Sequence, residues 1–207
     1  MRAYWLAIIG LFLFGAGTAS AQHGRFGAKA GVTAADAVFE SAADDPGYGK
    51  RIFISGGGFA VQPIAGPLAL QVEALFVSKG GEYTDDSQTT YTLMLDYLEL
   101  PALGRVAVAR SASHSVYLFA GPAAGFRLNA RFRSAAGRPI RNGVNQDISS
   151  DVKLFELSAT AGGGVDIGRH LVFDARYSWG LSDLNKDSRA GHGVRNRALT
   201  VMAGFRY

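Results

Sequence analysis

The chain has 207 residues, 48% of them hydrophobic, and a formal net charge of +4. It contains no cysteine, which excludes a disulfide framework. The positive excess is small and is not gathered into a basic stripe, so we expect no nucleic-acid partner.

The first 21 residues have the pattern of a secretory signal peptide. Arg2 gives a basic start, residues 4–14 are apolar, and Ala19-Ser20-Ala21 forms a small-residue cleavage site. The apolar stretch is only about half of the ~20 residues that a membrane-spanning helix needs. We therefore predict a signal peptide over 1–21 and one exported domain over 22–207.

Beyond Gln22 no window approaches 18 continuous apolar residues, so we predict no transmembrane helix. Instead, short segments alternate between an apolar face and a small or polar face. In chain order they are 26–33, 51–62, 68–76, 97–108, 116–132, 154–167, 171–182 and 199–207. A period of two residues predicts a β-strand for each.

The clearest alternation runs over 116–132. Its even-numbered residues, from Val116 through Ala130 to Phe132, form the apolar face, and its odd-numbered residues become more polar toward Arg131. The facing of 51–62, which contains the triplet Gly56 to Gly58, is ambiguous. Glycines inside strands are typical of a tightly curved sheet.

The connections between these segments alternate in length. Three are short, 63–67, 110–114 and 168–170, and four are long and polar, 34–50, 80–90, 133–151 and 185–195. Bacterial outer-membrane barrels have this layout, with short periplasmic turns and long outer loops. The sequence therefore predicts an all-β fold, an eight-stranded antiparallel up-and-down transmembrane β-barrel in the outer membrane.

The polar faces predict a lumen in which charges pair. The expected network comprises Lys29, Glu73, Glu99, Arg105, Arg127, Glu156, Asp166, Asp174, Arg176 and Arg206, and Arg131 shares this face. A soluble eight-stranded barrel has the same period but turns its apolar face inward around a ligand. Tyr177 and Trp179, near the long-loop end of their segment, favour lipid, since aromatic girdles lie at membrane interfaces.

The C-terminal segment carries a predicted assembly signal. Phe205 and Tyr207 share the outward face, and an aromatic terminus resembles the signal that the outer-membrane insertion machinery reads. No strand edge can stay open in hydrocarbon, so this segment must also pair with 26–32.

Four motifs resemble those of one family. They are FGAKAG at 26–31, LQVEALF at 70–76 followed by Lys79-Gly80, YLELP at 97–101 and YLFAGP at 117–122. Their identity and order are similar to the PorT-like outer-membrane β-barrel family. This resemblance implies an eight-stranded barrel in a Gram-negative outer membrane. The founding member assists protein secretion, but the fold alone does not transfer that role.

The sequence carries few candidate catalytic or metal-binding residues. The four histidines form no closely spaced pair, so we predict no metal site, no cofactor and no enzyme activity. An outer-membrane lipid-modifying enzyme would need a serine, a histidine and an acid at the outer rim. Ser182, Asp183 and His192 are the residues that could meet there.

Charged loop residues suggest two contacts. Arg131, Arg133, Arg138 and Arg141 could face the phosphates of lipopolysaccharide, because arginine pairs well with phosphate. The acidic residues Glu40, Asp44, Asp45, Asp85 and Asp86 could bind calcium weakly, but a solvated outer loop is the better explanation for them.

Three functions remain open at this point. The first is a non-enzymatic structural or interaction scaffold that displays four outer loops. The second is a small pore, transport or secretion-accessory barrel, and the third is a lipid-modifying enzyme. The expected partners are outer-membrane lipid, lipopolysaccharide and the insertion machinery; the sequence identifies no extracellular or secretion partner.

Overall fold

The computed structural model describes residues 24–39, 49, 51–84, 89–136, 144–149, 152–183 and 194–207. The predicted signal peptide lies outside them. The described residues form nine strands: β1 (Arg25–Phe39), β2 (Arg51–Ala65), β3 (Leu68–Thr84), β4 (Thr89–Arg110), β5 (His114–Ala136), β6 (Val144–Asp147), β7 (Phe155–Ile167), β8 (Leu171–Gly180) and β9 (Val194–Arg206). No helix among these residues is long and apolar enough to cross a membrane.

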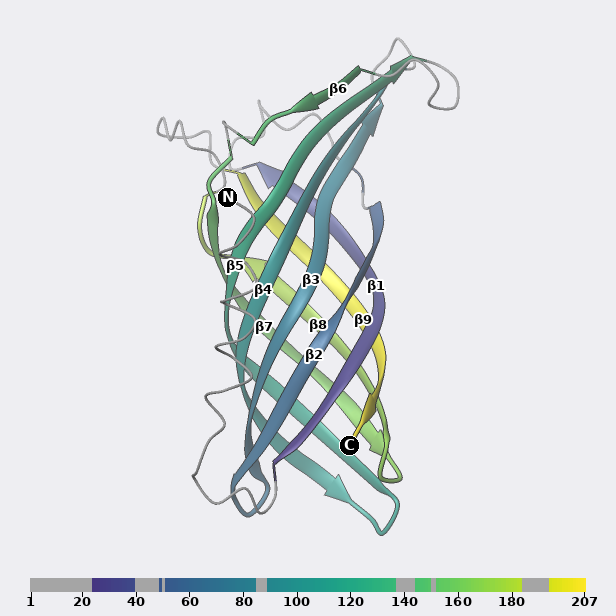
Figure 1. The fold of residues 1–207 in the computed structure, drawn as a ribbon, viewed down its shortest axis with the longest axis vertical. Helices are drawn as coiled ribbons and strands as arrows, with labels where there is room; N and C mark the ends of the chain where they lie inside the picture. The colour runs from purple at the N-terminus through teal and green to yellow at the C-terminus, as the bar shows by residue number, and fades with distance from the viewer. Residues whose placement is uncertain are drawn as a thin grey trace, which may run out of the picture.

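Eight of the strands close into an antiparallel ring. Each pairs with its neighbours along the chain, β5 pairs with β7, and β1 closes the ring against β9. The closing register runs from Gly27 opposite Arg206 to Phe39 opposite Val194. The three short turns and the C-terminus lie at one end, and β6 adds to β5 at the other (Figure 1). The predicted eight-stranded transmembrane barrel is confirmed.

The side chains face as the alternation predicts. On β9, Leu199 and Val201 are 50% and 52% exposed, whereas Thr200 and Met202 are 4% and 2% exposed. Each of the eight ring strands has at least one large apolar side chain exposed on its outer face. Such a continuous apolar surface requires lipid around it. The soluble-barrel alternative, which turns the apolar face inward, is therefore wrong.

The structure settles the ambiguous facing of β2. Phe53, Ser55 and Phe59 point inward and are buried, while Ile52 and Ile54 are exposed. The glycine triplet lies between them without a change of face.

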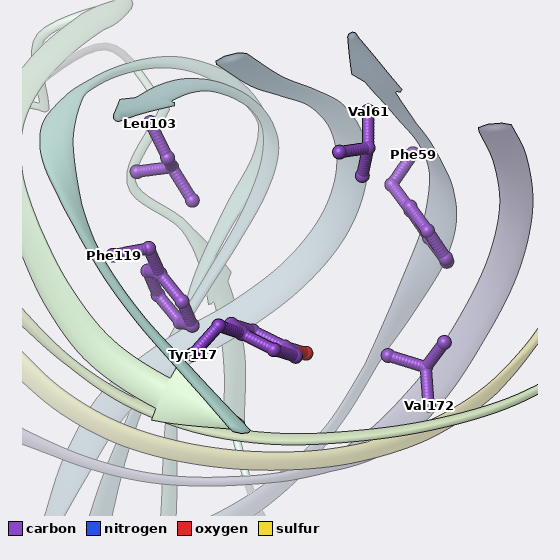
Figure 2. Packing of buried hydrophobic residues seen from close by; sticks show 6 residues of the cluster. All are labelled: Phe59, Val61, Leu103, Tyr117, Phe119 and Val172. Carbon is purple, nitrogen blue, oxygen red and sulfur yellow. The ribbon is translucent and has the colours of Figure 1, made fainter. Parts of the chain in front are cut away.

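An apolar cluster fills part of the lumen. Six inward side chains pack together in Figure 2: Phe59, Val61, Leu103, Tyr117, Phe119 and Val172. On the neighbouring strand β7, the residues paired with Tyr117 and Phe119 are the glycines Gly164 and Gly162. A Cβ on Gly162 would lie 2.8 Å from the Phe119 ring, and one on Gly164 would overlap the Tyr117 ring. Glycine in β7 thus makes room for the aromatic side chains that close the lumen.

Several strands extend further than the alternation predicts. β1 continues to Phe39, β5 to Ala136, and β3 and β4 pair as far as Thr84 opposite Thr90. These ends fall in the regions predicted as long loops, and β6 lies there too. Backbone pairing can continue beyond the lipid, where the side chains no longer need to alternate in polarity.

A bulge in β5 corrects one predicted face. Arg127 lies opposite Tyr97 and Asn129 opposite Asp96, so Leu128 is an extra residue in the ladder. One extra residue exchanges the two faces beyond it. Ala130, predicted to face lipid, is fully buried, and Arg131 is exposed.

Candidate functional site

Four charged side chains form a closed quartet in the middle of the lumen. Lys29 of β1 donates to Glu73 of β3 and to Asp174 of β8, each over 2.8 Å. Arg176 of β8 donates to Glu73 over 2.6 Å and to Asp174 over 3.0 Å. All four side chains are at least 96% buried. Two cations and two anions cancel here, which is how buried charge is tolerated.

A second charged layer lies toward the long-loop end. Lys79 of β3 pairs with Glu99 of β4, and its Nζ lies 3.5 Å from the Glu156 carboxylate of β7. Asn196 Nδ2 donates to the other Glu156 oxygen over 3.2 Å. This layer has one cation and two carboxylates.

Lys79 was not predicted to face the lumen. The signal was present, because Gln71, Glu73, Leu75, Val77 and Lys79 follow each other at a spacing of two. The prediction ended this segment at 76, where the clear apolar alternation stops, whereas β3 continues through Lys79. At this inward position, the Lys79 ammonium offsets one charge of the buried carboxylates Glu99 of β4 and Glu156 of β7.

A third layer lies toward the short turns. Arg105 of β4 and Arg206 of β9 both donate to the same oxygen of Asp166 on β7. Arg105 also donates to Gln71 over 3.1 Å, and its guanidinium lies 3.4 Å from the centre of the Tyr117 ring. Two cations share one carboxylate in this layer, with a cation–π contact supporting one of them.

Arg127, predicted to belong to the lumen network, has a different role. Its guanidinium donates to the carbonyl oxygens of Ser149 over 2.8 Å and Lys153 over 3.2 Å. Arg127 therefore ties the outer connection between β6 and β7 to the barrel.

The predicted lipopolysaccharide contacts lie partly within the described residues. Arg131 is exposed and Arg133 is half-buried, and both belong to the outer end of β5 that pairs with β6. Arg138 and Arg141 lie outside the described residues.

The enzyme constellation receives no support from the residues that the structure describes. The Ser182 hydroxyl accepts a hydrogen bond from the Leu157 amide over 2.9 Å, and Asp183 lies 3.8 Å from the Lys153 ammonium. His192 and the acidic loop residues Glu40, Asp44, Asp45, Asp85 and Asp86 fall outside the described residues. Within the part of the chain that is described, no three potential metal ligands gather.

The predicted assembly signal lies where the barrel closes. Phe205 and Tyr207 are exposed on the outer face, and the Tyr207 amide donates to the Phe26 carbonyl over 2.8 Å. The Tyr207 ring stacks on Phe26 and meets Phe205 edge-on, and His170 stacks on Phe205. The terminal aromatics thus form part of an aromatic rim at the short-turn end.

A closed ring with an apolar outer surface and a buried, charged interior defines an outer-membrane β-barrel. The chain belongs to the outer membrane protein beta-barrel domain family, whose model matches residues 20–186. No curated protein matches the chain.

Three solved structures are similar in shape. The attachment invasion locus protein Ail of Yersinia pestis is 13% identical, with a TM-score of 0.49 over 90% of this chain and 100% of its own. Neisserial surface protein A is 15% identical, with a TM-score of 0.46 over 88% and 97%. OprG of Pseudomonas aeruginosa is 10% identical, with a TM-score of 0.43 over 89% and 96%.

Proposed function

We propose that this protein is a non-enzymatic outer-membrane barrel, closed to solutes, that acts as a scaffold presenting four outer loops. The observation that carries the proposal is the central quartet. Its members come from β1, β3 and β8, so their hydrogen bonds cross the lumen between distant strands. An eight-stranded barrel has an interior that side chains can fill, and these side chains are held in place by one another.

The quartet has apolar and charged side chains on both sides along the barrel. The layer formed by Lys79, Glu99 and Glu156, called the Lys79 layer, lies toward the outer loops. Toward the periplasm lie the rings of Tyr117 and Phe119 and the layer in which Arg105 and Arg206 meet Asp166. A continuous water path through the lumen would have to pass these buried side chains. This arrangement disfavours the pore alternative.

We also place the chain in the PorT-like group. Its resembling motifs supply lumen charges: Lys29 lies in the first, Glu73 in the second and Glu99 in the third. The motifs therefore coincide with the residues that fill the barrel. A secretion role for this chain would rest on analogy of fold alone.

Export and membrane contact complete the proposal. Cleavage after Ala21 would release the mature chain, and Phe205 and Tyr207 would direct it to the insertion machinery. Arg131 and Arg133 lie at the outer end of β5, where guanidinium groups would reach lipopolysaccharide phosphates.

Planar-bilayer recording tests the closed-barrel proposal. The purified mature protein, reconstituted at single-molecule density, is expected to show little steady conductance. Large and stable open channels would contradict the proposal. Lipid A mass spectra of cells with and without the protein address the enzyme alternative, and they should be the same.

A further inference from the structure

The periplasmic end of the barrel holds a cavity of about 660 Å³. Residues of all three short turns line it, together with inward side chains of the adjoining strand ends. These turns lie at the lower end in Figure 1. The volume falls in the range of about 300–1,000 Å³ that is typical of small-ligand sites.

The cavity lining is strongly cationic. Five arginines contribute to it: Arg25, Arg105, Arg110, Arg169 and Arg206. Asp166 is the one carboxylate side chain among the lining residues, and its Oδ2 is already shared by Arg105 and Arg206. This cavity, called the mouth below, therefore has four more guanidinium groups than side-chain carboxylates, and the main-chain carboxylate of Tyr207, which also lines it, offsets one of them.

Two of the arginines are held by Asp166, and three lie at the surface, where Arg110 donates to the Gly66 carbonyl oxygen over 3.4 Å. Arg105 and Arg206 are buried against Asp166 and form the floor of the cavity. Arg25, Arg110 and Arg169 are exposed. Arg25 is close enough to Arg206, Arg105 and Arg110 for their positive charges to repel it, and close enough to Asp166 for that carboxylate to attract it.

Among the described charged layers inside the barrel, the other two have no positive excess. The central quartet is neutral, and the Lys79 layer has more carboxylate than ammonium. Like charges held together by a fold repel each other unless an anion lies between them. Clefts lined by one sign of charge also concentrate ions of the opposite sign.

We propose that the periplasmic mouth is a binding site for a phosphate-bearing anion, held by Arg25, Arg110 and Arg169 above the floor made by Arg105, Asp166 and Arg206. Guanidinium groups match phosphate geometry through paired N–H donors, and several arginines around one concave site suit a ligand with more than one negative charge. The site is separate from the outer loops and does not depend on the scaffold proposal.

Calorimetric titration of the full mature chain in non-ionic detergent tests this site, with inorganic pyrophosphate as the probe. We expect one pyrophosphate per barrel, with an affinity that falls as salt rises. The double variant Arg25→Gln with Arg169→Gln should bind at least about tenfold more weakly, since charge-assisted hydrogen bonds are lost. Heat-modifiable gel migration checks that this variant is folded.

A matched control removes two exposed arginines at the other end of the barrel. Arg195→Gln with Arg197→Gln on β9 changes the net charge equally and should leave the pyrophosphate affinity unchanged. Equal weakening in the two double variants would overturn the proposal, because it would show attraction to net charge alone. Absence of pyrophosphate binding at millimolar concentration would overturn it as well.

Repeating the titration in phosphatidylglycerol nanodiscs distinguishes two sources of the phosphate, a soluble compound and a lipid headgroup. An unchanged affinity would support a site for a soluble phosphate compound. Loss of pyrophosphate binding only in these nanodiscs, restored in detergent, would support occupation of the same site by lipid headgroups.

Discussion

The side chains on the outer face and on the lumen face of a single strand differ sharply in polarity. On β8, Phe173, Ala175 and Trp179 are exposed to lipid, while Asp174 and Arg176 between them are buried. A lipid-facing side chain has no hydrogen-bond partner outside the protein, so the outer face must be apolar. The lumen face can be charged because each charge meets its counterpart across the barrel.

This difference indicates where the chain is tolerant. Apolar residues on the outer face are interchangeable in principle, since lipid adapts to their shape. Lumen residues are coupled to named partners on distant strands, as Lys29 is to Glu73 and Asp174. Substitutions should therefore have additive effects outside and strongly coupled effects inside.

The largest effect is expected from removing the end of β9. Deletion of 205–207 removes the exposed aromatics Phe205 and Tyr207 and the hydrogen bond from Tyr207 to Phe26. An unpaired edge would then be left where the ring closes. We expect loss of heat-modifiable migration on gels and accumulation of unfolded chain in the periplasm. Arg206→Gln, which keeps the aromatics, should be milder, and a folded truncated chain in the outer membrane would contradict this role.

Breaking the quartet should have the next largest effect. Glu73→Ala leaves Lys29 and Arg176 with only Asp174 between them, and an uncompensated buried charge costs roughly 3–5 kcal/mol. The free energy of unfolding can be followed in urea through the fluorescence of Trp179, which lies on the lipid face.

The coupled double variant is the control for that prediction. Lys29→Met with Glu73→Gln leaves one anion, Asp174, opposite one cation, Arg176. It should lose less stability than the sum of the two single variants. Simple additivity would mean that the quartet does not act as a unit.

A smaller cost is expected for a charge on the lipid face. Ala159→Arg on β7 points outward, and a cation near the membrane midplane costs roughly 2–4 kcal/mol. Thr160→Arg points into the lumen, where Thr160 is buried and lies 2.9 Å from the Ser178 hydroxyl, so its cost should be set by packing. Urea unfolding in bilayers of two thicknesses distinguishes the two variants. Only the free energy of unfolding of Ala159→Arg should change with bilayer thickness. If only Thr160→Arg responded to bilayer thickness, the assignment of the outer and lumen faces would be wrong.

The sequence could predict the barrel because lipid imposes a period of two on every strand. That periodicity identified the ring strands and the inward positions of Glu73, Asp174 and Arg176. It could not predict which acid meets which base, because pairs such as Lys29 with Asp174 join strands far apart in the chain. The resembling motifs mark several of these residues but not their partners.

The remaining differences arise where lipid no longer constrains the chain. Lys79 lies beyond the clear apolar alternation of its segment, so its place in the lumen was missed. The bulge at Leu128 changes the facing of Ala130 through one extra residue, which composition does not reveal. The arginines of the mouth at the short-turn end come from turns and strand ends, and only the closure of the ring brings them together.

The central claim is that alternate residues of each strand face lipid and a filled lumen. The chain has no cysteine, so single cysteines can be placed along β9 at 198–203 and spin-labelled without interference. In lipid bilayers, the accessibility of the labels to dissolved oxygen should alternate with a period of two. It should be high at Leu199, Val201 and Ala203, and low at Ala198, Thr200 and Met202. Alternation in the opposite phase, or uniform accessibility along the strand, would contradict the account.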